Sequence, residues 1–153
     1  MAKNKTLTKG SALAILDKIA FFDDLNHAEK KLICDFNCHF MTYERGHFLT
    51  DENSLDKRFF ILLSGGVNII KGAQEQLIVQ LKPGEIIGEI SFLSNEPRTA
   101  SVVANCDSSA LVIDPDLLDQ LPIEVREKVK DQIILRMAQR LNHMNNRLAL
   151  GHL

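Results

Sequence analysis

Glu89 and Arg98 are the two residues whose types and spacing could do chemistry, because they stand nine positions apart around a short, largely apolar stretch. If residues 89–93 form one helical turn, its free backbone amides point outward and form a small anion site. These amides belong to Glu89, Ile90 and Ser91. The guanidinium of Arg98 adds a planar fork of donors that suits a bidentate bond to a phosphate. Together these residues predict a phosphate site.

The type of residue at position 89 indicates what the phosphate is attached to. An ionised carboxylate only accepts hydrogen bonds, so Glu89 would repel a phosphate placed beside it. We therefore expect Glu89 to accept the hydroxyl hydrogens of a sugar that carries the phosphate. Donors for an anion beside an acceptor for hydroxyls are typical of a site for ribose phosphate.

The segment GEISFLSNEPRTASV, residues 88–102, resembles the phosphate-binding cassette of cyclic nucleotide-binding domains. That family includes the sensor domain of catabolite activator-type regulators and the regulatory subunits of protein kinase A. The resemblance implies that Glu89 binds the ribose 2′-hydroxyl and that Arg98 binds the exocyclic oxygens of the cyclic phosphate. It also implies a backbone cradle in which Gly88 permits close approach. The amides of this cradle belong to Ile90, Ser91, Thr99 and Ala100.

The same resemblance covers the chain from about Leu13 to Leu150 and extends to the nucleotide base. It implies that the purine rests on apolar residues of the roll, and the corresponding positions are Ile69, Val79, Leu81 and Ile87. Thr99 could bond the 2-amino group of a syn guanine, but threonine is also common here in cAMP binders. The implied ligand is therefore cAMP, with cGMP left open. Two polar residues of the last helix, Asn142 and Asn145, would reach the base.

The arrangement of apolar residues predicts the elements that must position this site. Helical spacing dominates residues 1–35, and strand-like segments separated by turns fill residues 36–113, including the cassette at 86–100. Helical signals return over 114–150. We expect one domain over 1–153 that is mainly β: an antiparallel β-roll or jelly roll with N-terminal helices, a short cassette helix and a long C-terminal helix. The expected strands include segments beginning at Phe36, Arg58, Val67, Gln76, Thr99 and Ser109.

Three local patterns add detail to this architecture. Asp114-Pro115 resembles a helix cap followed by proline at the first helical position, and Pro122 repeats that signal before the long helix. The turn TDENSLDKR, residues 50–58, lacks the glycine that family members usually carry after the second strand. We expect the long helix to extend to about Leu150, which is roughly 40 Å.

Composition and motifs exclude several functions. The net charge of -2 favours no polyphosphate partner, so we expect no nucleic acid. Apolar runs are too short for a membrane span or a signal peptide, so we expect a cytoplasmic protein without membrane insertion. No catalytic motif is present, and Glu89 and Arg98 supply neither a metal pair nor a strong general base. We therefore expect no enzyme, no catalytic residue and no cofactor besides the ligand.

A zinc site near Cys34 and Cys38 is an alternative, with His39 and His27 as further ligands. In a strand, however, His39 would point away from Cys38, and there is no second pair of cysteines at metal-ligand spacing. Buried reduced thiols are the usual interpretation in the cytosol. We therefore expect no metal.

The apolar residues of the last helix predict how ligand binding is passed on to a partner. A stripe of apolar residues at alternating spacings of three and four suits a parallel partner helix: Ile134, Met137, Leu141, Met144 and Leu148. An earlier stripe, Val125, Val129 and Ile133, is expected to pack on the roll. The alternative is that both stripes are buried in the chain's own core. The helix also resembles the dimer helix of catabolite activator-type regulators, although the five residues after Leu148 are too few for a DNA-reading module.

Two functional hypotheses follow. The first is a stand-alone receptor for cAMP, or for cGMP. In it Arg98 and the cassette turn tighten on the ligand, the last helix moves to cover the base, and a second subunit or another protein senses that movement. The second is a scaffold that keeps the roll and dimerises through its last helix without a ligand.

Overall fold

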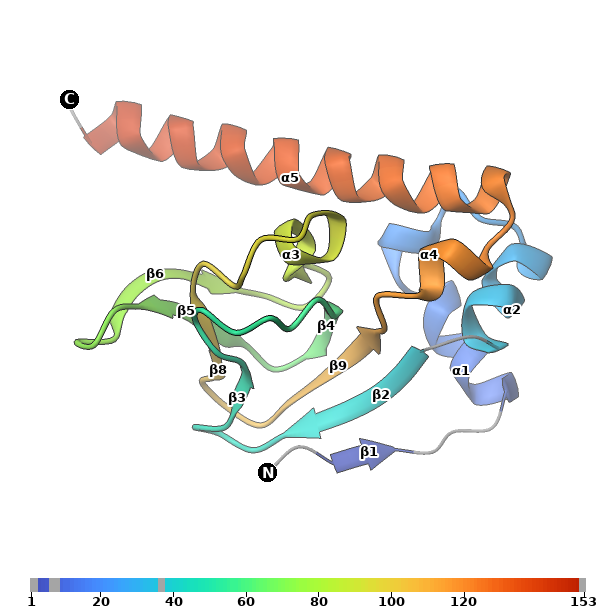
Figure 1. The fold of residues 1–153 in the computed structure, drawn as a ribbon, viewed down its shortest axis with the longest axis horizontal. Coiled ribbons are helices and arrows are strands. Elements are labelled where there is room, and N and C mark those ends of the chain that lie inside the picture. Colours follow the sequence, from blue (N-terminus) through green and yellow to red (C-terminus); the bar gives the residue numbers. More distant parts are fainter. Residues whose placement is uncertain (1–2, 6–8, 36–37, 152–153) are drawn as a thin grey trace.

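Two antiparallel sheets form the centre of the molecule in the computed structural model, which describes residues 3–5, 9–35 and 38–151. Figure 1 shows the strands rolled together beneath one long helix. The first sheet contains, in spatial order, β1 (Lys3–Lys5), β2 (Cys38–Tyr43), β9 (Ser108–Ile113), β4 (Phe59–Ser64) and β7 (Ile86–Ile87). The second contains β3 (Phe48–Thr50), β8 (Ser101–Ala104), β5 (Val67–Lys71) and β6 (Gln76–Leu81). This is the predicted β-roll.

The helices occupy both ends of the chain and one position inside the roll sequence. They are α1 (Lys9–Asp17), the 3-10 helix η1 (Ala20–Phe22), α2 (His27–Asp35), α3 (Glu89–Leu93), α4 (Leu117–Gln120) and α5 (Ile123–Gly151). In Figure 1, α1, α2 and α4 gather near the start of α5, and α5 then continues past α3. The predicted helical turn at residues 89–93 is α3 itself.

Strands β4 and β9 separate two apolar cores. Alternate residues of a strand point to opposite faces, so Phe59 and Ile61 of β4 pack with the helices, whereas Phe60 and Leu62 point into the roll. Both faces are covered, which is why β4 is apolar at consecutive positions rather than alternating. The sheet is thus a wall between the helical core and the roll.

The first half of α5 is buried against the helical core, and its second half is largely exposed. Val125, Val129 and Ile133 are buried in the helical core, as predicted for the earlier stripe. Ile134, by contrast, is 59% exposed, and Leu148 near the end of the helix is 63% exposed. The alternative that both stripes are buried in the chain's own core is therefore wrong.

Some predicted boundaries differ from the structure. The helix expected at Asp114-Pro115 begins only at Leu117, because the Asp114 carboxylate pairs with Nε2 of His39 at 2.9 Å instead of capping a helix. The strand expected from Thr99 begins at Ser101. Strands β1 and β7 were not predicted, because one is polar and the other has only two residues. The predicted strand start at Phe36 lies outside the described residues, and the strand is described from Cys38.

The N-terminal helices should contribute to stability as part of the helical core. Leu16 of α1 is fully buried, so Leu16→Ala should lower the free energy of unfolding by about 2–5 kcal/mol in urea denaturation. Leu55, which is 75% exposed, provides the matched control, and Leu55→Ala should change it by less than about 0.5 kcal/mol. Equal effects of the two substitutions would show that α1 does not belong to the folded unit.

Candidate functional site

Gly88 holds the start of the cassette in a conformation that other residues rarely adopt. Its φ of 82° lies in the left-handed region, and it directly precedes α3. A Cβ at this position would lie 2.4 Å from Nη1 of Arg98 and 2.9 Å from the carbonyl oxygen of Arg58. Glycine is therefore required here by both its backbone and its size.

The side chain of Phe92 fastens the single turn of α3 to the sheet. Its ring lies 5.3 Å from the ring of Phe59 on β4, centroid to centroid, and it is buried in the helical core. The opposite side of the turn remains accessible, because Ile90 is 46% exposed. Packing on one side thus fixes a turn that is too short to be stable alone.

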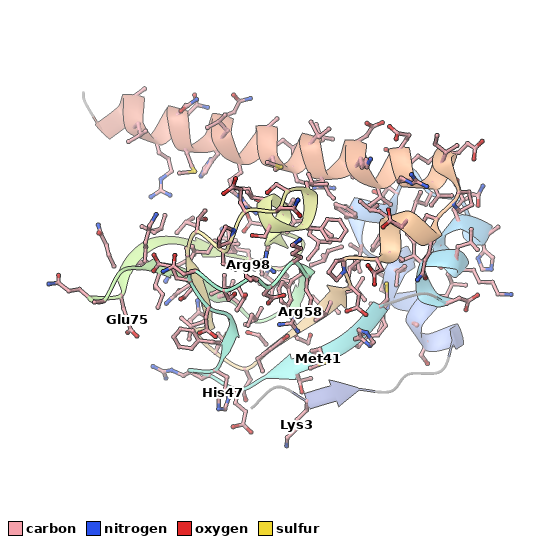
Figure 2. The ribbon with its side chains drawn as sticks, viewed as in Figure 1. Lys3, Met41, His47, Arg58, Glu75 and Arg98 are labelled. Carbon is pink, nitrogen blue, oxygen red and sulfur yellow. The ribbon has the colours of Figure 1, made fainter. Side chains whose placement is uncertain are left out.

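The guanidinium of Arg98 lies inside the protein, where it joins three segments. Its Nη1 donates to the carbonyl of Gly88 at 2.7 Å, its Nε donates to the hydroxyl of Thr50 at 3.1 Å, and its Nη2 donates to the carbonyl of Arg58. Figure 2 shows Arg98 below α3, with the partly exposed Arg58 nearby. Only 4% of Arg98 is exposed, and this burial lowers its pKa, although the carboxylate of Asp56 at 3.6 Å opposes the change.

The loop after β3 supplies the negative charge beside Arg98. Asp56 accepts hydrogen bonds from the hydroxyl of Thr50 at 2.8 Å and from Nη2 of Arg58 at 2.9 Å. The loop is also tied to the cassette through the backbone, since the amide of Asn53 donates to the carbonyl of Arg98 at 2.8 Å. Burial would raise the pKa of Asp56, but the hydrogen bonds from Arg58 and Thr50 outweigh it and hold the pKa at about 2.

Glu89 faces α5 rather than Arg98. Its Oε1 accepts a hydrogen bond from Nη1 of Arg140 at 3.2 Å, and only 8% of Glu89 is exposed. The second arm of Arg140 donates from Nη2 to the carbonyl of Ile86 in β7 at 2.6 Å. Arg140 therefore connects the long helix to both sides of Gly88.

A groove of about 880 Å³ lies between α5 and the edge strand β6 with the turn that follows it. Val79 and Leu81 line its floor on the β6 side. The residues that α5 contributes share a largely basic or polar character and are Arg136, Gln139, Arg140, His143, Met144 and Arg147. The groove thus has both apolar and polar residues on the side of β6 and its turn, and mainly basic or polar residues on the side of α5.

The other predicted residues differ in burial and position. Ile69 pairs with Val79 across β5 and β6, both pack against the core of the roll, and Ile87 is buried within it. Ser91 is buried, Thr99 is exposed and Ala100 is half-buried. Asn142 and Asn145 are exposed on α5 and are not among the residues that line the groove.

Sequence reasoning missed four residues that surround the cassette: Thr50, Asp56, Arg58 and Arg140. The first three precede strand β4 and look like an ordinary polar turn in the sequence. A signal for Arg140 was present, since Arg136, Arg140 and Arg147 recur on one face of the predicted helix.

Cys34 and Cys38, the cysteines of the alternative zinc site, pack against the helical core. Burial raises the pKa of the Cys34 and Cys38 thiols. Among residues 3–5, 9–35 and 38–151, no three histidine, cysteine or acidic side chains gather closely enough to hold a metal ion. Within the same ranges, no helix has both the length and the apolar character needed to cross a membrane.

The low pKa of Asp56 predicts how acid affects stability. Because the folded-state pKa is about 2 and the ordinary value is 3.8, the ionised carboxylate contributes about 2 kcal/mol above pH 4, and this contribution is lost as the pH falls toward 2. Urea denaturation should show that Asp56→Asn is less stable than the wild type at pH 6 and that the difference shrinks on acidification. Asp119→Asn, at an exposed position in α4, should change stability by less than about 0.5 kcal/mol at pH 6. A difference for Asp56→Asn that is the same at pH 6 and pH 3 would contradict the assignment.

Comparison with known proteins places this geometry in context. The profile of the family described as "Cyclic nucleotide-binding domain" matches residues 40–122, which include the whole cassette. A CRP-like cAMP-activated global transcriptional regulator of Mycobacterium tuberculosis is 32% identical over 110 residues, covering 70% of this chain and 49% of that protein. Human cGMP-dependent protein kinase 2 is 34% identical over 83 residues, covering 51% of this chain and 11% of the kinase. The chain thus spans about half of the length of the first relative and about a tenth of the length of the second.

Solved structures agree with the sequence matches. A cyclic nucleotide-binding domain from Methylobacillus flagellatus superposes with a TM-score of 0.84 at 25% identity, covering 99% of this chain and 90% of that one. The matched fold includes the helices at both ends as well as the roll. With its β-roll, its left-handed glycine before a one-turn helix and its buried arginine, the chain belongs to the cyclic nucleotide-binding domain family.

Proposed function

We propose that this chain is a cytoplasmic receptor for a cyclic nucleotide, cAMP before cGMP, which reports binding through its C-terminal helix and carries out no chemical step. The observation that supports this most strongly is the near-complete burial of two opposite charges, Glu89 and Arg98, in one short cassette. Burying a charge is costly, so buried charges that do not simply pair with each other are candidates for a binding role.

The partners of Arg98 support a role in phosphate binding. Nη1, Nε and Nη2 donate to the neutral carbonyl of Gly88, hydroxyl of Thr50 and carbonyl of Arg58, and the one charged partner, the carboxylate of Asp56, lies 3.6 Å from Nη2. A phosphate oxygen carries charge and would form stronger hydrogen bonds with the same donors. In this proposal the phosphate takes over part of the fork, the amides of the cassette cover its other oxygens, and Glu89 binds the ribose hydroxyl. The cassette amides belong to Ile90, Ser91, Thr99 and Ala100.

The proposed place of the purine is the apolar interior of the roll beside the groove. Val79 and Leu81 line the groove, whereas Ile69 and Ile87 stay predicted contacts, and Ile87 is only 1% exposed. Asn142 and Asn145 also stay predicted contacts, which would need α5 to turn or move. We favour cAMP because a relative with a high share of this chain aligned is named as cAMP-activated. One observation favours cGMP instead: Arg136, Arg140 and Arg147 line the groove, and arginine donors suit the O6 and N7 acceptors of guanine.

A scaffold without a ligand is the second candidate. It is favoured by the internal hydrogen bonds of Arg98 and by the ion pair between Glu89 and Arg140, because both side chains already have partners within the protein. The two candidates differ in whether a cyclic nucleotide raises the stability of the chain, since a ligand that binds only the folded state must do so.

The outer face of α5 supports a homodimer as the form in which the receptor reports binding. Ile134, Leu141 and Leu148 are each about 60% exposed, and their spacing of seven residues places them along one line of the helix. Met137 is half-buried against the helical core, and Met144 lines the groove. The exposed line is therefore the part of the predicted seam that is available to a second copy.

Ligand binding should depend on both buried charges. Arg98→Lys keeps the positive charge but removes the planar fork of donors, and Glu89→Gln removes the carboxylate that accepts the ribose hydroxyl. Each substitution should weaken cAMP binding at least tenfold, or about 1.4 kcal/mol, in titration calorimetry. Glu96→Gln, at an exposed position in the same cassette, is the matched control and should bind like the wild type.

A comparison of nucleotides completes this test. A cyclic nucleotide at about 100 times its dissociation constant should stabilise the wild type by about 2.7 kcal/mol in thermal unfolding, and 5′-AMP should not. If neither cAMP nor cGMP has an effect up to millimolar concentration, the receptor is excluded and the scaffold is favoured. If both bind, their ratio of affinities decides the base preference.

The dimer should depend on the middle of the exposed line. Leu141→Glu places a charge in the seam and should halve the mass measured by sedimentation velocity. Asn146→Glu adds the same charge on another face of the helix and should leave the mass unchanged. A wild-type chain that sediments as a monomer at high micromolar concentration would rule out the homodimer.

A further inference from the structure

Strand β6 is an edge strand with little protection against pairing with another chain. It lies at the end of the second sheet and has six residues, none of them charged and none of them proline. The other edge strands, β1, β3 and β7, have only two or three residues, and β1 also carries lysines. Short strands and lysines are common means by which proteins keep a sheet edge from pairing. Among the described strands, β6 therefore offers the longest edge for a further strand.

Apolar side chains are exposed along the same edge. Leu77 is 50% exposed and Ile78 is 47% exposed, and both line the groove between β6 and α5. In the ladder with β5, Val79 pairs with Ile69 and Leu77 pairs with Ile70, so Ile78 has no partner across it. An added strand would continue the ladder with its backbone and cover these apolar side chains with its own.

The wall of the groove opposite β6 belongs to α5, which passes above β6 in Figure 1, and it is positively charged. From residue 132 onward the sequence has three arginines and no acidic residue, although the whole chain has a net charge of -2. All three line the groove: Arg136, Arg140 and Arg147. Lys82 lies on the side of β6, and of the described residues that line the groove, Glu85 is the one that is acidic. Charge complementarity therefore selects an acidic occupant.

Two of these arginines have no acidic partner. Arg140 pairs with Glu89, but neither Arg136 nor Arg147 forms an ion pair with any part of the chain that the structure describes. The Nε of Arg136 is also buried without a hydrogen-bond partner among those residues. A buried donor without a partner costs free energy, and a carboxylate placed in the groove would remove that cost.

We propose that this groove is a docking site for an extended, acidic segment of a partner protein. The segment adds a strand to β6, covers Leu77 and Ile78 with apolar side chains and directs carboxylates toward Arg136 and Arg147. The lengths agree, because these two arginines are separated by roughly 16 Å along α5, which about five residues of an extended chain span. The inference goes beyond the proposed function, since it concerns a protein partner and requires no nucleotide.

Other occupants fit these features less well. The first ten residues of the sequence carry three lysines and no acidic residue, and the last ten also carry no acidic residue, so neither segment complements the arginines. A nucleic acid would satisfy the arginines but would not use the backbone edge of β6 or its apolar side chains. The exposed line of Ile134, Leu141 and Leu148 lies on the opposite side of α5 from the arginines, at about 100° per residue, so the site leaves that line accessible to a second copy.

A fluorescein-labelled peptide of alternating glutamate and valine, about as long as β6, tests the proposal by fluorescence anisotropy without nucleotide. The wild type should bind it, and should bind the matched lysine-valine peptide at least about tenfold more weakly. Two further versions, N-methylated at the glutamates or at the valines, lose the amide donors of opposite edges of the strand. One of the two should bind at least about tenfold more weakly than the other, because only one edge of the peptide pairs with β6.

Two substitutions with matched controls test the contacts in the protein. Arg147→Glu should weaken binding of the glutamate-valine peptide at least about fivefold, whereas Lys130→Glu, the same change of charge on α5 outside the groove, should not. Ile78→Ser should weaken it about threefold or more, whereas Leu55→Ser, at an exposed loop position, should not. Circular dichroism checks that the four variants fold.

Three results would overturn the proposal: no binding of the glutamate-valine peptide up to about 1 mM, equal weakening by Arg147→Glu and Lys130→Glu, or equal binding of the two methylated peptides. A short uridine RNA that binds as tightly as the peptide would also overturn it, because the groove would then recognise polyanions in general. None of these results bears on the calorimetry with cyclic nucleotides, so this proposal and the proposed function fail separately.

Discussion

The hydrogen bonds of the buried Arg98 guanidinium are the interactions on which the site depends. The guanidinium joins the carbonyl that precedes α3, the carbonyl that precedes β4 and the hydroxyl at the end of β3, and Asp56 balances its charge. The carbonyl of Gly88 also accepts the amide of Phe92 at 3.2 Å, and the hydroxyl of Thr50 also donates to Asp56, so the contacts of Arg98 belong to a network in which buried polar groups have partners. Glycine is required at position 88 because a Cβ there would occupy the space of the Arg98 side chain.

A second basic residue has the opposite relation to the cassette. Arg98 comes from within the roll and organises the loops around it, whereas Arg140 comes from α5 and reaches the cassette from outside. The two arginines thus contact Gly88 or its neighbours from opposite sides.

Local patterns in the sequence predicted much of this, and contacts between distant segments explain what they did not predict. The turn at residues 89–93 and the main strands follow from residue types that lie close together in the chain, whereas the binding roles of Glu89 and Arg98 stay predictions. Thr50 and Asp56 could not be found in that way, because their importance depends on pairing with a residue more than forty positions away. The start of α4 was wrong for the same reason, since Asp114 pairs with His39 of a distant strand. Short strands such as β7 have too few residues for any periodicity.

The wall formed by β4 and β9 has a mechanical consequence. Phe60 and Phe59 are consecutive residues, yet one borders the interior of the roll and the other supports Phe92 and the N-terminal helices. Close-packed interiors are hard to compress, so a displacement of side chains on one face of these strands is transmitted to the other face. The backbone between Phe59 and Phe60 therefore links the two cores rigidly. A shift of side chains inside the roll would move the helical core even without a connecting loop.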